Sequence, residues 1–401
     1  MEKERAYQYW LHNLPGIGDR SIEKLLKQFK SAEQIYHMGI DALRLTVQKK
    51  RREELEAFLL MWDVEEKYEE LLRKKIYFIP IDDKRYPERL RKLEHPPYAL
   101  YCLGNLPKEQ TPSAAIIGAR ECSEYGSYVA EAFARRLAQA GVSVISGMAR
   151  GIDGISQQAA LLAGGRTYAV LGSGVDVCYP ASNRKLYEEI RQKGGGILSS
   201  FPPGTQPVKW QFCERNRIVA GLSDLVLVVE ARLKSGTSLT VDMALEQGKS
   251  VYAVPGRLTD RLSDGCNYLL RQGAEIALTP EDIISELAVL QNRRGIAGQR
   301  PEQLSEETSE QKPKQIPEQR PEKESEGNTP VAEASEKDLL FLSFLDAYPK
   351  SADEILRLMR KKGNDMELPY LLEGMISLCM KGLARQTGGN YFSKICSNIQ
   401  F

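Results

Sequence analysis

A glycine-paced segment near the middle of the chain is the first place where the residues indicate chemistry. Gly147-Met148-Ala149-Arg150-Gly151-Ile152-Asp153 follows the apolar run Val142–Ile145 and precedes the helix-like Ser156–Ala163. A glycine turn between a buried strand and a helix lets backbone N–H groups and the helix N-terminus face an anion, most often phosphate. Arg150 adds a positive charge, so the segment predicts a phosphate site.

Further loops share this glycine-rich character, and each follows an apolar run. They are Gly118-Ala119-Arg120, Gly172-Ser173-Gly174, Ser235-Gly236-Thr237 and Pro255-Gly256-Arg257. Ligands of open α/β sheets bind at the carboxyl ends of the strands. We therefore predict a polyanion-binding surface that contains Arg120, Gly147, Met148, Ala149, Arg150, Gly151, Gly172, Ser173, Gly174, Lys209, Arg215, Asn216, Arg217, Ser235, Gly236 and Thr237.

Charged residues of these loops have alternative partners within the chain. Arg120 closes a predicted strand, where its guanidinium can reach a phosphate with two parallel hydrogen bonds. The alternative is an ion pair with Glu121 or Glu124. Arg150 and Asp153 can equally pair with each other across the turn. We expect Asp153 to cap the following helix rather than to contact a ligand.

The segment Lys209–Arg217 interleaves cations with aromatic residues. Such a surface neutralises phosphates while bases stack on the rings, at about 1–3 kcal/mol each. The structural alternative places Trp210 and Phe212 in the core, because large rings are usually well buried. For Arg215 and Arg217, on either side of Asn216, a core position is less expected because the segment offers no apolar face for them to cover. Asn216 either orients one of these arginines or contacts phosphate.

Between residues 76 and 287, apolar runs of strand length alternate with segments of helix length. The expected strands are Tyr77–Ile81, Ala114–Ile117, Val142–Ile145, Tyr168–Leu171, Ile197–Ser199, Leu225–Val229 and Val251–Val254, and the expected helices include Tyr125–Ala140, Lys185–Gln192 and Leu239–Gln247. Continuous Val, Ile and Leu strands between amphipathic helices favour an α/β fold whose mainly parallel sheet is covered on both faces.

Residues 1–75 form a separate helical segment by their spacing of apolar residues. Within it, Leu14-Pro15-Gly16-Ile17-Gly18 precedes the expected helix Ser21–Phe29 and looks like a helix-hairpin-helix turn. The glycines of such a turn let the backbone approach a nucleic-acid phosphate closely. A plain hairpin between two helices, with glycine caps, explains the same residues equally well.

Residues 291–335 are predicted to be a disordered linker. The stretch 300–338 holds 6 Lys/Arg and 11 Asp/Glu together with five prolines, and it has few apolar residues to bury. The remaining residues carry 49 basic and 43 acidic side chains, and this modest surplus permits nucleic-acid binding.

Residues 336–395 predict a small domain of three helices and a hairpin, which is a winged-helix layout. The helices are expected around Leu339–Phe341, Ser351–Leu356 and Leu368–Met380, and the hairpin in Leu383–Gln386 with Gly388–Phe392. The third helix has no lysine or arginine before Lys381, although such residues usually read the major groove. We therefore expect a protein-contact or accessory role for this domain.

Composition and missing motifs narrow the function classes. The 401 residues are 42% hydrophobic and 27% charged, with no signal peptide pattern and no apolar span of membrane length, so we expect a cytoplasmic protein without a membrane partner. Seven scattered cysteines form no C-x-x-C pair, and we expect no metal site. All three histidines precede the glycine loops, and no nucleotide-hydrolysis loop G-x-x-x-x-G-K-[ST] occurs. We predict a binding protein with no catalytic residues and no cofactor.

In their order along residues 76–290, these motifs resemble the DNA-processing protein A family, also called DprA or Smf. The resemblance rests on Gly118–Arg120, Ser146–Asp153, Gly172–Gly174 with Tyr179-Pro180, Arg215–Ser223, Glu230-Ala231, Ser235–Ser238, and Ala253–Gly256 with Gly265–Asn267. Ala181 departs from the pattern, because some relatives carry a basic residue there.

The resemblance implies a Rossmann-like, doubly wound domain, usually a homodimer, that binds single-stranded DNA entering a bacterium during natural transformation. It also implies that the protein protects this DNA and helps to load the RecA recombinase onto it, with the residues named above contacting the DNA. The alternative is a nucleotide phosphoribohydrolase of the lysine-decarboxylase-like group. Its P-G-G-x-G-T-x-x-E loop corresponds to Ser235–Thr240, which lacks the proline, one glycine and the acid.

Overall fold

The computed structural model describes residues 2–298, apart from 41, 42, 44–46 and 48, and residues 335–394, apart from 346–349, 362, 365 and 387–390. The chain divides into two compact units, Met1–Gly298 and Gln299–Phe401. Most of the predicted linker, residues 299–334, lies outside the described residues. Its first part does not fit the prediction, because helix α14 (Pro280–Gly298) continues past residue 291.

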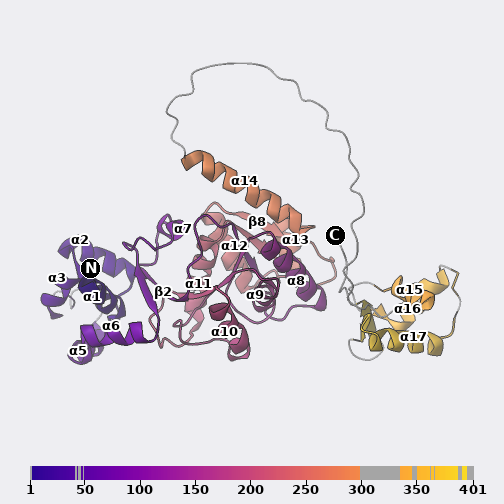
Figure 1. The fold of residues 1–401 in the computed structure, drawn as a ribbon, viewed down its shortest axis with the longest axis horizontal. Coiled ribbons are helices and arrows are strands. Elements are labelled where there is room, and N and C mark those ends of the chain that lie inside the picture. The colour runs from indigo at the N-terminus through magenta and orange to yellow at the C-terminus, as the bar shows by residue number, and fades with distance from the viewer. Residues whose placement is uncertain are drawn as a thin grey trace, which may run out of the picture. The chain divides into compact units, whose positions relative to one another are not determined.

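A mainly parallel sheet forms the centre of the first unit (Figure 1). Among the described residues its order is β1-β2-β6-β5-β4-β3-β7-β8-β9. The strands are β1 (Tyr77–Pro80), β2 (Ala99–Gly104), β3 (Ser113–Ile117), β4 (Ser143–Ser146), β5 (Thr167–Val170), β6 (Gly196–Ser199), β7 (Leu225–Val228), β8 (Ser250–Ala253) and β9 (Glu275–Ile276). Strands β3 to β9 pair in parallel, whereas β2 is antiparallel to both β1 and β6. The predicted α/β class is confirmed, and β2 and β9 are additions to it.

Strand β3 lies at the point where the winding of the sheet reverses. From β3 the chain proceeds through β4, β5 and β6 in one direction, and through β7, β8 and β9 in the other. The loops that leave β3 and β7 therefore diverge, and they open a crevice at the carboxyl edge of the sheet.

Helices cover both faces of this sheet. They are α7 (Glu88–Arg91), α8 (Glu124–Gln139), α9 (Ile152–Leu162), α10 (Arg184–Gln192), α11 (Lys209–Leu222), α12 (Gly236–Glu246) and α13 (Asp264–Arg271), followed by α14. Alternate residues of β3 point to opposite faces: Ala115 and Ile117 pack in the cluster formed with α7, α11, α12 and α13. Ala114 and Ile116 pack in the cluster formed with α8, α9 and α14. Helix α9 begins at Ile152, earlier than the predicted Ser156.

The N-terminal helices share a core with the edge of the sheet. They are α1 (Glu2–Asn13), α2 (Asp19–Phe29), α3 (Ala32–His37), α5 (Arg52–Met61) and α6 (Val64–Arg73), drawn at the indigo end of Figure 1. The Tyr9 ring on α1 lies 5.5 Å from Phe78 and 6.1 Å from Tyr101, measured between ring centroids. Residue 75 thus marks a change of secondary structure inside one compact unit.

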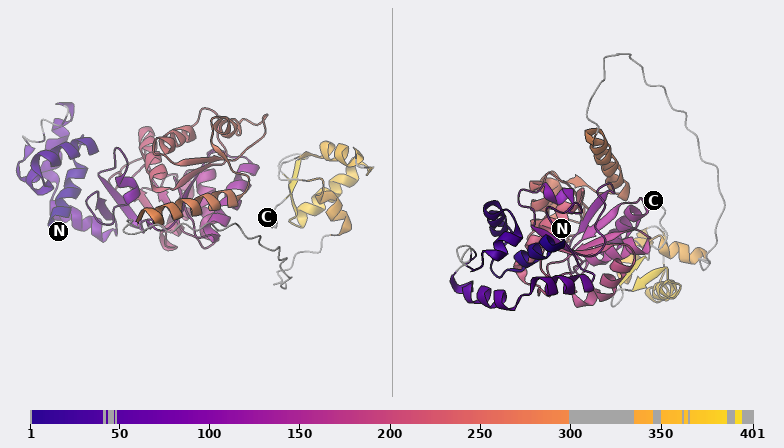
Figure 2. Two further views of the ribbon diagram at one scale, coloured as in Figure 1. Left: turned by 90° about the horizontal axis from the view of Figure 1, so that it is seen from above. Right: turned by 60° about the vertical axis from the view of Figure 1, so that its left-hand side comes forward.

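The second unit contains α15 (Glu336–Leu342), α16 (Ala352–Lys361) and α17 (Leu368–Met380), shown in yellow and orange in Figure 2. Strands β10 (Lys350–Ser351), β11 (Ala384–Gln386) and β12 (Tyr391–Lys394) form a small sheet in the order β10-β12-β11. The described elements follow the order of the predicted three helices and hairpin, with β10 as an extra strand, and residues 388–390 of the predicted hairpin lie outside the described residues. No helix within the described ranges is long and apolar enough to span a membrane.

Candidate functional site

A cavity of about 710 Å³ opens where the loops after β3, β4 and β7 meet the start of α11. We call it the edge cavity. Of the predicted site residues, it is lined by Arg120, Gly147, Ala149, Lys209, Arg215, Asn216, Ser235, Gly236 and Thr237. Asp153, Tyr179, Phe212 and Thr240 also line it. The fold therefore brings together residues that are more than a hundred positions apart in sequence.

Arg120 reaches the edge cavity from the loop after β3. This loop is fixed from two sides, because the Ala119 N–H donates to the Glu230 carbonyl at 2.7 Å and the Ile152 N–H donates to the Ala119 carbonyl at 3.2 Å. The Arg120 guanidinium lies over the Phe212 ring, 5.5 Å from its centroid. Within the described chain Arg120 forms no ion pair, so the alternative with Glu121 or Glu124 is not observed.

Aromatic side chains form part of the cavity wall. Phe212 is half-buried and lies 5.6 Å from the Tyr179 ring, and Tyr179 is 44% exposed. Trp210 points away from the core with 60% of its surface exposed, contrary to the structural alternative for this residue. It contacts Phe201 edge to face at 5.5 Å. Helix α11 thus presents two rings near its N-terminus that solvent or a ligand can reach.

The turn Gly147–Asp153 is closed by the chain's own carboxylate. Asp153 accepts a hydrogen bond from the Gly147 N–H at 3.1 Å, and Gln157 accepts one from the Met148 N–H at 3.0 Å. Asp153 neither caps α9, whose N-cap is Gly151, nor pairs with Arg150. A phosphate at this turn would have to compete with these internal acceptors for the Gly147 and Met148 N–H groups, so the geometry disfavours this turn as the anion site.

Three residues of that turn lie outside the lining of the edge cavity, contrary to the prediction. Met148 is fully buried. Gly151 adopts φ +71°, and a side chain there would collide with the Ala119 carbonyl. Arg150 is exposed to solvent.

Arg215 is a buried support of the cavity rather than a mobile cation. Its Nη1 donates to the carbonyls of Gly147 and, at 2.7 Å, Val170, and its Nε donates to the Asn216 side chain at 3.0 Å. Burial lowers the pKa of Arg215 and raises the pKa of Asp153, while the attraction between the two charges opposes both shifts. Asn216 therefore orients an arginine, one of the two roles left open by the sequence.

Gly172, Ser173 and Gly174 form a buried turn behind the cavity wall, not part of its lining. A Cβ on Gly172 would lie 2.9 Å from the Phe212 ring, so glycine lets Phe212 pack against the backbone here. The Ser173 hydroxyl donates to the Val177 carbonyl at 2.9 Å. These three residues are thus packed inside the protein, and they do not reach the cavity where the other predicted site residues meet.

The helices that follow β3 and β7 differ in what faces their N-termini. At α8, Glu230 accepts hydrogen bonds from the Ser123 N–H at 2.9 Å and from the Ser123 hydroxyl. At α12, the N-cap Ser235 makes no side-chain capping bond, and its Oγ is buried without a partner. The start of α12 is therefore an open helix N-terminus at the edge cavity.

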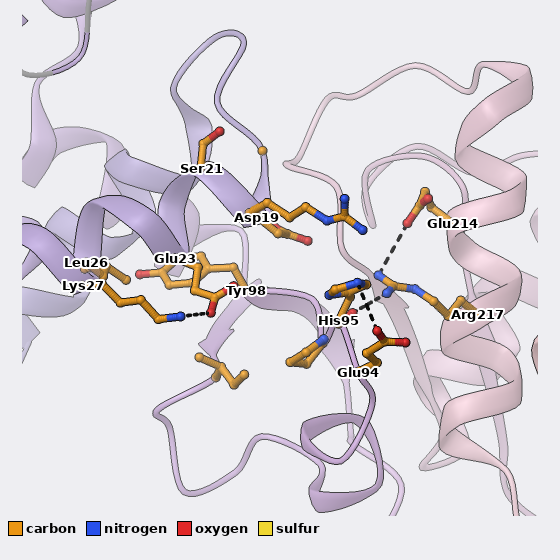
Figure 3. A pocket seen from close by; sticks show the side chains of 14 residues that line it. Asp19, Ser21, Glu23, Leu26, Lys27, Glu94, His95, Tyr98, Glu214 and Arg217 are labelled. Atoms are coloured by element: carbon orange, nitrogen blue, oxygen red, sulfur yellow. Dashed lines mark hydrogen bonds and ion pairs between the residues drawn. The ribbon is translucent and has the colours of Figure 1, made fainter. Parts of the chain in front are cut away.

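Arg217 lines a different cavity, of about 700 Å³, between α11 and α2 (Figure 3). Its Nη1 donates to the His95 carbonyl, and its Nη2 lies 3.5 Å from Glu214. Contrary to the prediction, Arg217 does not share a surface with Arg120 and Lys209. The same cavity is lined by Gly18 and Asp19, so the predicted hairpin turn faces the sheet domain and carboxylates.

Sequence reasoning did not find the positioning roles of Glu230 and Gln157, or the place of Thr240 in the cavity lining. Glu230 directly follows the apolar run Leu225–Val229, and a carboxylate at the end of a buried strand is a usable signal. Gln157 and Thr240 lie inside helices and carry no comparable signal.

The sequence model of the DNA recombination-mediator protein A family matches residues 77–288. The chain belongs to this family. It is 40% identical over 204 residues to the DNA processing protein DprA of Streptococcus pneumoniae, which covers 51% of this chain and 72% of that protein. It is 40% identical over 211 residues to the protein Smf of Escherichia coli, covering 53% of this chain and 56% of that protein.

The fold of this DprA/Smf family member agrees with a solved relative. The X-ray structure of DNA processing protein A from Streptococcus pneumoniae matches with a TM-score of 0.59 at 32% identity, covering 71% of this chain and 98% of that one. This match supports the Rossmann-like α/β class, and the edge cavity lies within the residues that define the family.

Proposed function

We propose that this chain binds single-stranded DNA in the edge cavity and delivers it to the RecA recombinase during natural transformation. The observation that carries the proposal is the convergence of Arg120, Lys209 and the open N-terminus of α12 on one cavity. Neither cation forms an ion pair within the described residues, so both are available to phosphates. Tyr179 and Phe212 supply aromatic surface for bases.

Recombinase loading and protection of incoming DNA are inferred from family membership, since a recombination mediator acts between DNA and a recombinase. We place this activity in the cytoplasm and propose that the protein works as a homodimer. The sheet ends at β9, where Ile276 is 48% exposed and the nearby Leu278 is 63% exposed, and this apolar edge favours self-association.

We propose accessory roles for the remaining segments. The C-terminal unit has the element order of a winged helix, but α17 carries no lysine or arginine, which favours contact with protein. The hairpin between α1 and α2 has helix-hairpin-helix spacing, but it faces the sheet domain across a cavity in which four carboxylates outnumber Arg20, Lys27 and Arg217, which gives a phosphate no surplus of positive charge. We assign this hairpin a bracing role.

The decisive experiment is gel-shift competition between single-stranded and duplex oligonucleotides at two salt concentrations. We expect a clear preference for single strands and a linear fall of log affinity with log salt. Equal affinity for duplex would contradict the proposal. The alternative, a phosphoribohydrolase, predicts release of free base from a nucleoside monophosphate. It is disfavoured because Asp153, a cavity carboxylate, is held by the Gly147 N–H and faces Arg215.

A further inference from the structure

We propose that the N-terminus of α12 seats a phosphate monoester, the group that ends a phosphorylated DNA strand. The inference rests on the proposed DNA binding and adds which phosphate enters the cavity. Helix α12 has eleven residues, long enough for a developed N-terminal field, and Ser235, Gly236, Thr237 and Thr240 of its first turns line the cavity.

Unpartnered donors gather at this helix start. Thr240 is 3% exposed and Thr237 is 9% exposed, and among the described residues neither hydroxyl has a hydrogen-bond partner. The Ser235 hydroxyl is buried without a partner as well. Because more than about nine-tenths of buried polar groups in proteins are satisfied, the enclosed Ser235 hydroxyl, beside two threonine hydroxyls without a protein partner at the same helix N-terminus, indicates a ligand rich in acceptors.

The neighbouring loops do not compete for that ligand. Glu230 occupies the start of α8 and Asp153 occupies the turn before α9, so each of these N–H clusters already faces an anion. Arg120 and Lys209 line the same cavity as Thr240, and Asp153 offsets the charge of the buried Arg215. The cavity therefore offers two uncompensated positive charges beside the free hydroxyls.

The number of donors and charges fits a monoester better than a diester. A terminal phosphate carries a charge of about −1.5 to −2 at neutral pH and three acceptor oxygens. A phosphate within a strand carries one charge and two free oxygens, and its two ester bonds keep it on the path of the strand. The volume of about 710 Å³ is of the size that holds a small ligand, so one terminal nucleotide fits.

The test compares oligonucleotides of one sequence with a 5′-phosphate, a 3′-phosphate or hydroxyls at both ends, by fluorescence anisotropy with an internal dye. We expect one phosphorylated end to bind at least tenfold more tightly than the hydroxyl ends. Thr240→Val should bring this ratio to one. Ser238→Ala, which removes a hydroxyl outside the cavity lining, is the matched control and should keep the ratio. Thermal unfolding checks that each variant is folded.

Competition by thymidine 5′-monophosphate separates the two sources of a monoester. If the free nucleotide displaces the strand while the three oligonucleotides bind alike, the seat belongs to a free nucleotide and the strand-end assignment is overturned. If the three oligonucleotides bind with equal affinity and thymidine 5′-monophosphate does not compete, the monoester site is overturned. The proposed DNA binding then remains. Failure of all three oligonucleotides to bind contradicts the proposed function itself.

Discussion

Lys209 and Arg217 lie on the same helix, α11, and face two different cavities. Lys209 lines the edge cavity at the helix N-terminus, whereas Arg217 is directed to the His95 carbonyl beside α2. Helical periodicity produces this separation, because residues 209, 212, 213 and 216 share one face and residues 214 and 217 another. The two cations therefore form a matched pair for testing the proposed DNA site.

We expect Lys209→Ala and Arg120→Ala to weaken binding of single-stranded DNA for all sequences alike. Each lost phosphate contact should reduce the slope of log affinity against log salt by about 0.7. Arg217→Ala should leave both the affinity and the slope unchanged. Anisotropy titrations at three or more salt concentrations measure these quantities. An unchanged slope in the Lys209 and Arg120 variants would exclude direct contact.

Asp153→Asn should destabilise the fold by about 3 kcal/mol, because it leaves the buried Arg215 without its opposing charge. Urea unfolding followed by circular dichroism measures the change in the free energy of unfolding. Asp242→Asn on the exposed side of α12 is the control and should change it by less than about 0.5 kcal/mol. Equal effects of the two variants would show that Asp153 has no special role in the turn.

Stability should fall as the pH decreases from about 6.5 to about 4, with a contribution from His12. Burial lowers the pKa of His12 to about 4, and its Nδ1 lies 2.8 Å from the Tyr101 hydroxyl. Below its usual pKa of about 6.5 the unfolded chain binds a proton that the folded chain excludes, so the free energy of unfolding drops by up to about 3 kcal/mol.

His12→Gln should flatten this pH dependence, while His37→Gln at an exposed position of α3 should preserve it. Urea midpoints at pH 7, 6, 5 and 4.5 provide the comparison. Identical pH profiles for His12→Gln and the unmodified protein would rule out His12 as the titrating group.

Deleting residues 300–335 should tighten DNA binding at low salt. The segment holds nine Asp/Glu and five Lys/Arg, so we expect its net negative charge to compete with DNA for the cationic cavity. The gain should disappear at high salt because exposed charges are screened. A variant in which residues 300–335 are replaced by a Gly/Ser segment of the same length is the control for the effect of chain length. Affinities that match within error at 50 mM salt would reduce the segment to a tether.

The parallel sheet was predictable because its strands are continuous apolar runs, such as Leu225–Val228, separated by amphipathic helices. Strand β2 was not predicted because its run Ala99–Gly104 lies outside the regular alternation of strands and helices. It pairs antiparallel with β6. Strand β9 has two exposed residues and thus no burial pattern to detect. Local composition therefore predicts the repeated units of this fold better than its edges.

Nine of the sixteen predicted site residues line one cavity at the carboxyl edge of the sheet, and the other seven lie outside its lining. Arg120 and Lys209 face the cavity as expected, because their positions follow from the strand end and the helix start. The closure of the Gly147 turn by Asp153, and the burial of Arg215 across from it, depend on packing between distant segments. Helical periodicity would have placed Arg217 on a different face from Lys209 if Lys209–Leu222 had been identified as a helix.

The two internal carboxylates, Glu230 and Asp153, act as built-in counterions for their neighbouring backbone amides. A nucleic acid that arrives at this edge finds only a small set of positive groups left, and small salt ions exchange readily with it there. If this edge binds DNA as proposed, contact through so few groups would let another protein take over the strand without an energy source. The small number of uncompensated positive charges at the cavity would thus serve the proposed transfer of DNA, in which release matters as much as binding.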